Sequence, residues 1–283
     1  MLNYSVKVGH EEEWGSEPMR QFSIGLNPFP GLRPFTIDES HLFFGREGQV
    51  DEILEKLGKN HSVTVMGYSG SGKSSLMHCG LVPTLYGGFM TNQGPHWIVL
   101  IVRPGNAPIE NLTQAAIKLL LDSNRILPED VHIHRAIISS VLRSGSNGLV
   151  ELTSYLQTEL KENVFFLVDQ FEELFRFKSN GGEESENEAL LYTNLVIHAV
   201  HQRDQPVYVA LNMRSDFIGE CAAFPGLAQM INESNYLVPQ MTRDQKRLAI
   251  EGPVAVGGGQ ISPRLVKRLL SDMGDNQDQL PIM

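Results

Sequence analysis

The sequence has few cysteines, no long apolar segment and no excess of positive charge. Its 283 residues contain only two cysteines, Cys79 and Cys221, which cannot build a disulfide framework and suit a reducing compartment. The longest apolar run, Trp97–Val102, is far shorter than the ~20 residues that cross a bilayer. Lys and Arg total 23 against 33 Asp and Glu, a net charge of −10, which argues against overall attraction to nucleic acid or anionic lipid. We therefore expect a soluble, cytoplasmic protein that binds neither membranes nor nucleic acid.

Short apolar runs alternate with amphipathic helical patterns. Apolar residues make up 41% of the chain, enough to bury a core. The uninterrupted runs favour buried parallel strands, and the segments between them carry apolar residues at helical spacing. This alternation predicts an α/β fold with a five-strand, mainly parallel sheet between helices. The expected strands are 62–66, 97–102, 164–168, 207–211 and 236–238, and the expected helices are 47–57, 73–81, 109–121, 131–143, 149–160 and 188–202.

The character of the chain changes near both ends. Residues 1–28 show no sustained period and are expected to be a tail or linker, followed by the main α/β domain over 29–240. After residue 240 the strand patterns stop, and two helices are expected at 243–251 and 263–271. We interpret 241–283 as a partial helical subdomain at which the chain is truncated. The acidic segment 180–188 is expected to be a solvated surface loop.

A glycine-rich motif lies between an expected strand and an expected helix. The segment 67–74, GYSGSGKS, fits the pattern G-x-x-x-x-G-K-[ST]. Glycines allow the backbone to curl so that N–H groups face phosphate oxygens, and the helix that follows directs its positive end to the same place. Lys73 would contact the β- and γ-phosphates and Ser74 would bind Mg²⁺. The alternative is a Gly/Ser turn with an incidental lysine. The expected phosphate-binding residues are Gly67, Ser69, Gly70, Ser71, Gly72, Lys73, Ser74 and Ser75.

A second acidic motif follows the expected strand 164–168. Asp169 ends that strand and is expected to share Mg²⁺ with Ser74. Many P-loop ATPases have the water-activating glutamate directly after this aspartate, but here Gln170 takes that place and cannot accept a proton. The base is therefore expected to be Glu172 or Glu173. The alternative is that the two glutamates only begin a helix, where the dipole favours acids.

A guanidinium follows the next expected strand. Arg214 ends the run VALNMR, and its planar donors suit phosphate geometry. Taken alone, an arginine after a strand is more often a surface residue. Its place after the strand that follows Asp169 favours a role at the γ-phosphate, so Lys73, Glu172, Glu173 and Arg214 form the expected catalytic set.

Six motifs in this order resemble the novel STAND NTPases, signal-transduction ATPases related to NACHT and NB-ARC proteins within the AAA+ group. The motifs are NPFPGLRPFTIDESHLFFGRE (27–47), the P-loop, LVDQFEELF (167–175), RSDF (214–217), IEGP (250–253) and LPIM (280–283). The resemblance spans about 27–283. It implies an AAA+/STAND-like P-loop fold that binds ATP or ADP with Mg²⁺.

The resemblance also implies roles for individual residues. Phe44, Gly45 and Arg46 would lie near adenine and ribose. The alternative is that Phe43 and Phe44 are ordinary core residues. Arg214 corresponds to the sensor arginine, and Pro281 to a proline that packs against adenine in the ADP-bound form. The matching segment 103–105 suggests no role beyond ending a strand.

The family implies a switch in which nucleotide state gates oligomerisation, often for bacterial defence. We expect slow ATP hydrolysis, a homo-oligomer when ATP is bound, and an unknown trigger sensed by C-terminal domains outside this sequence. Two alternatives remain. One is a nucleic-acid-handling AAA+ ATPase of the origin-recognition type. The other is a non-hydrolysing scaffold that keeps ADP as a structural ligand, which the neutral Gln170 makes credible.

Overall fold

Five parallel strands form one sheet with helices on both faces. We describe the protein from a computed structural model, in which residues 28–88, 96–202 and 204–273 are described. The strand order is β2-β3-β4-β1-β5, and every neighbouring pair is parallel. The expected α/β fold is confirmed, and the sheet is wholly rather than mainly parallel. The strands are β1 (Ser62–Gly67), β2 (Trp97–Val102), β3 (Asn163–Val168), β4 (Tyr208–Arg214) and β5 (Asn235–Leu237).

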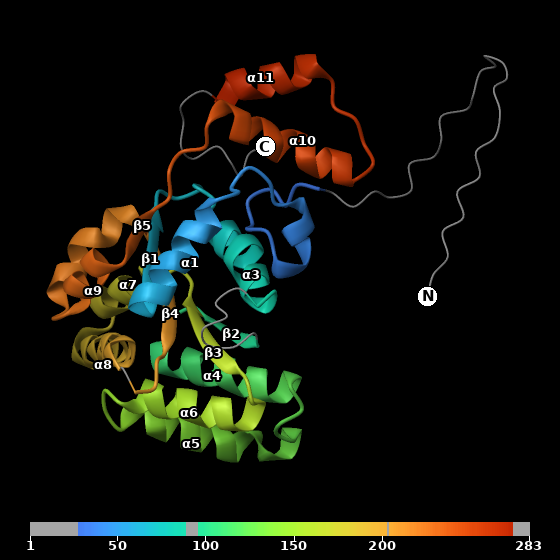
Figure 1. Ribbon diagram of the computed structural model, residues 1–283. Helices are drawn as coiled ribbons and strands as arrows, with labels where there is room; N and C mark the ends of the chain where they lie inside the picture. The colour runs from blue at the N-terminus through green and yellow to red at the C-terminus, as the bar shows by residue number, and fades with distance from the viewer. Residues whose placement is uncertain (1–27, 89–95, 203, 274–283) are drawn as a thin grey trace.

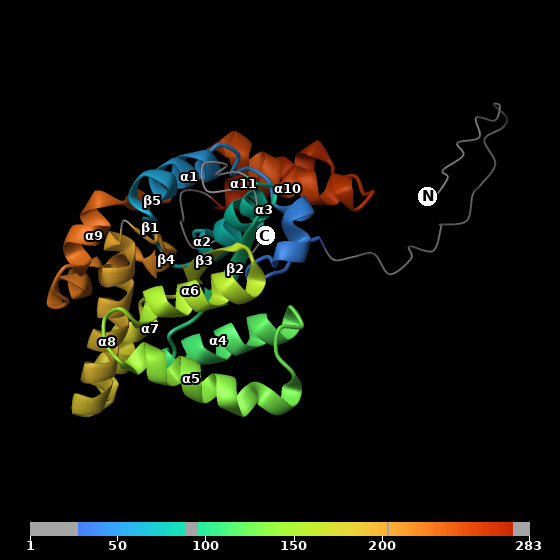
Figure 2. The same cartoon turned by 60° about the horizontal axis from the view of Figure 1, so that its bottom comes forward.

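The helices divide between the two faces of the sheet, because successive strand residues point to opposite sides. Phe166 and Val168 of β3 pack with α4, α6 and α8, whereas Phe165 and Leu167 pack with α1 and α3. Figures 1 and 2 show α4, α5 and α6 gathered on one side of the sheet, away from α1 and α3. The bounds are α1 (Gln49–Asn60), α3 (Val82–Tyr86), α4 (Pro108–Asp122), α5 (Val131–Arg143), α6 (Gly148–Leu160), α7 (Glu173–Asn180), α8 (Gly182–His201) and α9 (Leu227–Glu233).

The helix after the P-loop has an irregular middle. It begins as α2 (Lys73–Ser75), widens to a π-helical turn (Leu76–Leu81) and continues as α3. The expected helix over 73–81 therefore extends further along the chain. Pro83 lies in the first turn of α3, just after the π-helical turn. A proline inside a helix removes one N–H from the hydrogen-bond ladder, so the proline and the irregular turn occur together.

The acidic segment 180–188 is not a loop, contrary to the sequence-based expectation. Most of it forms the first turns of α8, which begins at Gly182. Glu183 and Glu184 lie in the first turn, where a carboxylate interacts favourably with the helix dipole. The same glutamates that suggested a solvated loop therefore favour the start of a helix.

Two helices form a second, smaller packing unit. α10 (Arg243–Val256) and α11 (Pro263–Met273) pack on each other and enclose a small apolar cluster that includes Ile250, Val266 and Leu270. They lie together beyond the end of the sheet in Figure 1. Both helices run somewhat longer than the 243–251 and 263–271 expected from sequence.

The parallel arrangement brings the polar residues that end or follow the strands to one edge of the sheet. Gly67 pairs with Arg214 at the carboxyl ends of β1 and β4, and Asp169 directly follows β3. Arg103 directly follows β2. Ligands of open parallel sheets bind outside this edge, so a binding site is expected here.

Candidate nucleotide-binding site

The loop between β1 and α2 has the backbone of a phosphate cradle. Gly70 and Gly72 have φ angles of +71° and +83°, which residues with a Cβ rarely adopt. A Cβ added at Gly67 would lie 2.8 Å from the Ser71 hydroxyl oxygen, so the loop is also closely packed. The loop opens directly into α2, whose first residue is Lys73. Its N–H groups can thus receive an anion together with the helix N-terminus.

Lys73 is held inside the loop. Its ammonium donates to the carbonyl oxygens of Gly67, at 2.9 Å, and Tyr68, at 2.7 Å. Burial lowers the pKa of Lys73, and the nearby Glu172 carboxylate acts in the opposite direction. Within the part of the chain that the structure describes, the buried Lys73 ammonium is hydrogen bonded to neutral carbonyls, which it can exchange for phosphate oxygens.

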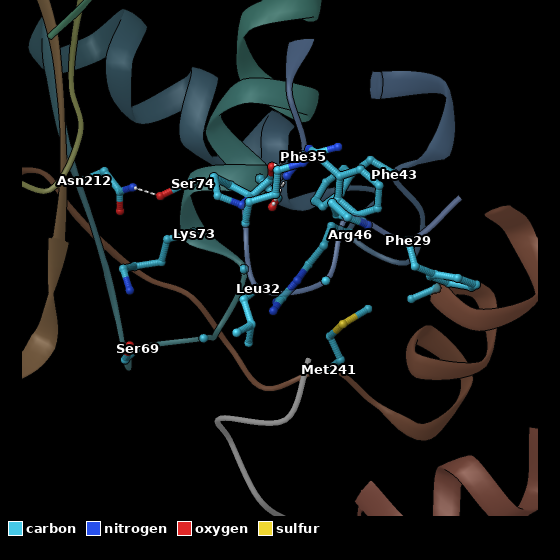
Figure 3. Close-up of a pocket in the computed structure, with 18 of the residues that line it drawn as sticks. Phe29, Leu32, Phe35, Phe43, Arg46, Ser69, Lys73, Ser74, Asn212 and Met241 are labelled. Carbon is cyan, nitrogen blue, oxygen red and sulfur yellow. Dashed lines mark hydrogen bonds between the residues drawn. The ribbon is translucent and has the colours of Figure 1, made fainter. Parts of the chain in front are cut away.

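Ser74, Asp169 and Asn212 form a hydrogen-bonded group. The Ser74 hydroxyl donates to Asp169 Oδ1 at 3.0 Å, and the Asn212 amide donates to Asp169 Oδ1 and to Ser74 Oγ, the latter at 3.0 Å. Figure 3 shows Asn212 pointing at Ser74. Asn212 Oδ1 is buried and has no hydrogen-bond partner among the described residues. A hydroxyl and a carboxylate in contact are hard oxygen ligands that fit Mg²⁺, which takes its remaining ligands from phosphates and water.

The two candidate bases point to different places. The Glu172 side chain lines the cavity beside the P-loop, is buried, and accepts a hydrogen bond from the Arg214 backbone N–H at 3.3 Å. Burial raises the pKa of Glu172. Glu173 begins α7 and accepts from the Gly105 N–H at 3.1 Å. Of these two glutamates, Glu172 lines the cavity and Glu173 is not among the described residues that line it.

Arg214 also lines the cavity, and its guanidinium is held by its neighbours. It makes a bidentate pair with Asp216, with distances of 3.1 and 2.7 Å. The guanidinium carbon also lies 5.6 Å from the centre of the Phe217 ring. These contacts give the RSDF motif a local purpose, which is to orient the guanidinium.

The cavity itself has a volume of 280 Å³, with a polar end and an apolar end. Lys73 and Ser69 lie at one end in Figure 3, and Phe29 and Met241 lie at the other. The Phe35 and Phe43 rings pack edge to face, with their centres 6.1 Å apart. An apolar end of this kind suits the flat face of a base. The apolar wall consists of Phe29, Pro30, Leu32, Pro34, Phe35, Leu42, Phe43, Phe44, Met241 and Ala249.

The segment that leads into the fold is part of this wall. The Phe35 N–H donates to the Ser75 hydroxyl at 3.2 Å, and the Cys79 thiol donates to the Thr36 carbonyl at 3.1 Å. These bonds attach the segment to the helix that follows the P-loop. Ser75, expected to bind phosphate, therefore uses its hydroxyl to hold the wall, although it also faces the cavity.

Arg46 lines the cavity but directs its donors to the protein. Its guanidinium donates to the carbonyl oxygens of Ser71 and Pro239, each at 2.7 Å, and to Gln49 Oε1 at 3.2 Å. Burial lowers its pKa to about 10. Arg46 thus joins the P-loop to the end of β5, a contact that the motif did not indicate.

The neighbours of Arg46 contact the helical unit. Gly45 has a φ of +86°, and a Cβ there would meet the Gln245 carbonyl and the Met241 side chain. The Phe44 ring lines the cavity and packs against Gly252 of α10. The remaining residue of the expected set, Pro281, lies outside the described residues.

Sequence reasoning missed three residues around Asp169. Arg103 donates to Asp169 Oδ2 from Nη2 at 3.0 Å and from Nε at 3.3 Å. Asn212 contributes the contacts given above, and His78 Nε2 lies 4.0 Å from Oδ2. Burial lowers the pKa of His78. The available signals were a polar residue within the apolar strand and an arginine directly after a strand.

The described residues contain no group of three or more His, Cys, Asp and Glu side chains arranged to hold a metal by themselves. Shared coordination by Ser74, Asp169 and phosphate does not need such a group. Within the same residues, no helix has both the length and the apolar character needed to cross a membrane.

Comparison with known proteins agrees with this geometry. The chain is similar in structure to the Walker-type ATPase PABY2304 of Pyrococcus abyssi, with a TM-score of 0.56 and 15% identity over 89% of this chain and 69% of that one. It is also similar to the ORC2 protein of Aeropyrum pernix, solved as ADPNP–ADP complexes, with a TM-score of 0.55 and 14% identity. That match covers 84% of this chain and 61% of the ORC2 chain. At these identities the likeness shows the fold.

A search of curated protein sequences finds no significant match. In contrast, the family model described as Novel STAND NTPase 1 matches residues 28–283, which is nearly the whole chain. The match includes the P-loop, the Asp169 strand and the helical unit. The chain therefore belongs to the Novel STAND NTPase 1 family.

Proposed function

We propose that the chain binds ATP and ADP with Mg²⁺ and acts as a switch that hydrolyses ATP slowly. The observation that supports this most strongly is that Lys73, Ser74, Glu172 and Arg214 all line one cavity, with Asp169 hydrogen bonded to Ser74. The same cavity has an apolar end that could receive the base. Membership of an NTPase family agrees with this assignment.

The polar end of the cavity would hold the phosphates. The N–H groups of the P-loop and the Lys73 ammonium would bind the phosphate oxygens, and Ser74 and Asp169 would hold Mg²⁺. Bound Mg²⁺ would neutralise charge on the phosphates. Asn212 would orient both metal ligands, since it already donates to each of them.

Glu172 is the residue that we propose for orienting the attacking water. It faces the cavity, and its raised pKa makes it a stronger base than an exposed glutamate. Glu173 instead binds the Gly105 N–H, which favours a role in placing the start of α7. Gln170 also lines the cavity but cannot accept a proton, which agrees with slow turnover.

Arg214 and Lys73 would distinguish ATP from ADP, because the two nucleotides differ by one phosphoryl group. Shifting an equilibrium from 1:99 to 99:1 takes about 5.5 kcal/mol of differential affinity. Two or three charge-assisted hydrogen bonds of about 1.5–3 kcal/mol each could provide it. Met241 and Ala249 also line the cavity, so nucleotide would contact both the sheet domain and the helical unit. We propose domains at 29–240 and 241–283, because α10 and α11 enclose an apolar cluster of their own.

Calorimetric titration with Mg²⁺·ATP tests the proposal. Lys73→Ala should abolish detectable binding, whereas Lys59→Ala, at an exposed lysine of α1, should bind like wild type. Glu172→Gln should keep binding and slow phosphate release at least tenfold, and Glu173→Gln should retain more turnover. Equal ATP affinity in wild type and Lys73→Ala would refute the proposed site.

The nucleotide carried by freshly purified protein provides a second test. Chromatography of the ligand released on denaturation would identify it. Bound ADP without measurable turnover would favour the structural-ligand alternative. Light scattering with ATP and with ADP would test the proposed oligomerisation, which should appear only with ATP. Turnover stimulated severalfold by duplex DNA would instead favour nucleic-acid handling.

A further inference from the structure

Both carboxylate oxygens of Asp169 already have partners within the chain. Oδ1 accepts from Ser74 and Asn212, and Oδ2 accepts two hydrogen bonds from the Arg103 guanidinium. The Asp169 side chain is 1% exposed, whereas that of Arg103 is 49% exposed. A buried carboxylate is therefore neutralised by a cation that reaches it from the solvent side.

We propose that Arg103 is a displaceable counter-ion for Asp169, which Mg²⁺ must replace when it binds with nucleotide. Arg103 would thereby set the Mg²⁺ concentration at which the site accepts Mg²⁺·ATP. It is a positioning residue that acts through Asp169, and the inference rests on the function proposed above. The segment 103–105, to which the sequence assigned no role, acquires one.

The surroundings of Arg103 suit a side chain that moves on a fixed backbone. The Asn111 amide of α4 donates to the carbonyl oxygens of Arg103, at 3.3 Å, and Pro104, at 2.8 Å. The Gly105 N–H is bound by Glu173. The backbone is thus anchored on two sides, while half of the side chain is in solvent. Asn212, by contrast, is 2% exposed and lies within β4, so it cannot leave Asp169 in the same way.

The charges determine the sign of the effect. Without Arg103, Asp169 would be a buried carboxylate without its hydrogen-bonded cation, a costly arrangement that the free protein avoids. The same removal would help Mg²⁺, because the ion would no longer displace a guanidinium or approach its charge. Loss of Arg103 should therefore destabilise the free protein and lower the Mg²⁺ concentration at which nucleotide binds. A residue with a merely structural role would change stability alone.

A contrary role predicts the opposite sign. If Arg103 instead moved to the phosphates, its loss would weaken Mg²⁺·ATP binding at every Mg²⁺ concentration. The Mg²⁺ dependence of binding thus separates a competitor of the metal from a ligand of the phosphate.

The experiment measures ATP affinity by calorimetry along a Mg²⁺ titration that begins with chelator. Arg103→Gln should lower the half-saturating Mg²⁺ concentration about threefold to tenfold, a range that allows for the half-exposed side chain. Arg103→Lys keeps the charge but cannot reproduce the two hydrogen bonds of the guanidinium, so its half-saturating Mg²⁺ concentration should lie between those of wild type and Arg103→Gln. Arg135→Gln is the matched control, since Arg135 is 48% exposed and paired with Glu110 at 3.6 Å away from the site; it should not shift the titration.

Thermal melting without nucleotide accompanies the titration and should show a lower melting temperature for Arg103→Gln than for Arg135→Gln. An unchanged or higher half-saturating Mg²⁺ concentration in folded Arg103→Gln would overturn the inference while leaving the proposed function intact. Wild-type protein that binds no ATP at any Mg²⁺ concentration would overturn both.

Discussion

Arg46 offers the sharpest test of how the site is built. The family resemblance places it near ribose, whereas the structure directs its guanidinium to Ser71 and Pro239. If the structural role dominates, Arg46→Ala should unfold more easily even when no nucleotide is present. If the ribose role dominates, the substitution should reduce affinity and leave stability nearly unchanged.

The expected loss follows from two opposing terms. Arg46 makes three hydrogen bonds, and bonds from a charged donor contribute about 1.5–3 kcal/mol each. Against this, burial lowers the Arg46 pKa from 12.5 to about 10, a penalty on the charged form of roughly 3 kcal/mol. The difference leaves about 1.5–6 kcal/mol of net stabilisation. Arg46→Lys should recover part of it, because an ammonium cannot span both carbonyls as the guanidinium does.

Urea denaturation of nucleotide-free protein measures this difference directly. Arg264→Ala, at an exposed arginine of α11, is the control and should stay within about 0.5 kcal/mol of wild type. The reasoning fails if Arg46→Ala matches that control in stability and loses tenfold or more in ATP affinity.

Two further predictions concern packing and pH. Gly252→Ala would place a Cβ 2.5 Å from Phe44 ring carbons and should lower stability by about 1–3 kcal/mol in thermal melting; Gly219→Ala, whose Cβ meets nothing within 4 Å, should be neutral. Burial raises the pKa of Cys79 and Cys221 to about 12 from 9.0. Folding favours the protonated thiols, so their contribution to the free energy of unfolding should be fully present below pH 9 and be lost as pH rises toward 12. The loss for each thiol should be at most about 1.4 kcal/mol per pH unit. Urea midpoints at mildly and strongly alkaline pH should therefore differ less in a Cys79→Ala, Cys221→Ala double variant, and an equal difference would contradict the assignment.

Much of the fold could be predicted because periodicity is a local property. The apolar run 97–102 and the helix 131–143 have the bounds expected from sequence. The prediction of a loop at 180–188 was wrong, because composition alone does not distinguish a solvated loop from the first turn of a helix. The strand expected at 207–211 continues to Arg214. The apolar pattern did not show this because Asn212 interrupts it, although the Asn212 amide nitrogen donates hydrogen bonds inside the fold.

The site was harder to predict than the fold, because its contacts join distant segments. The P-loop motif is local, and its glycines adopt the backbone that such a loop needs. The direction of Arg46 and the pairing of Arg103 with Asp169 depend on which strands are neighbours, and a single sequence does not reveal that. The choice between Glu172 and Glu173 likewise depended on the turn between β3 and α7. The roles assigned to all these residues stay predictions.

The two edge strands of the sheet, β2 and β5, differ in how readily they could pair with another copy of the chain. β5 has three residues, so one end offers few backbone groups for further pairing. β2 at the other end has six, and its sequence WIVLIV contains no charge and no proline. Among the described residues β2 pairs only with β3. Apolar, uncharged edge strands of about six or seven residues are segments from which aggregates can nucleate. Conditions that loosen the helices over β2 should therefore convert the protein to aggregates, and a lysine on this strand's edge would be the first remedy to try.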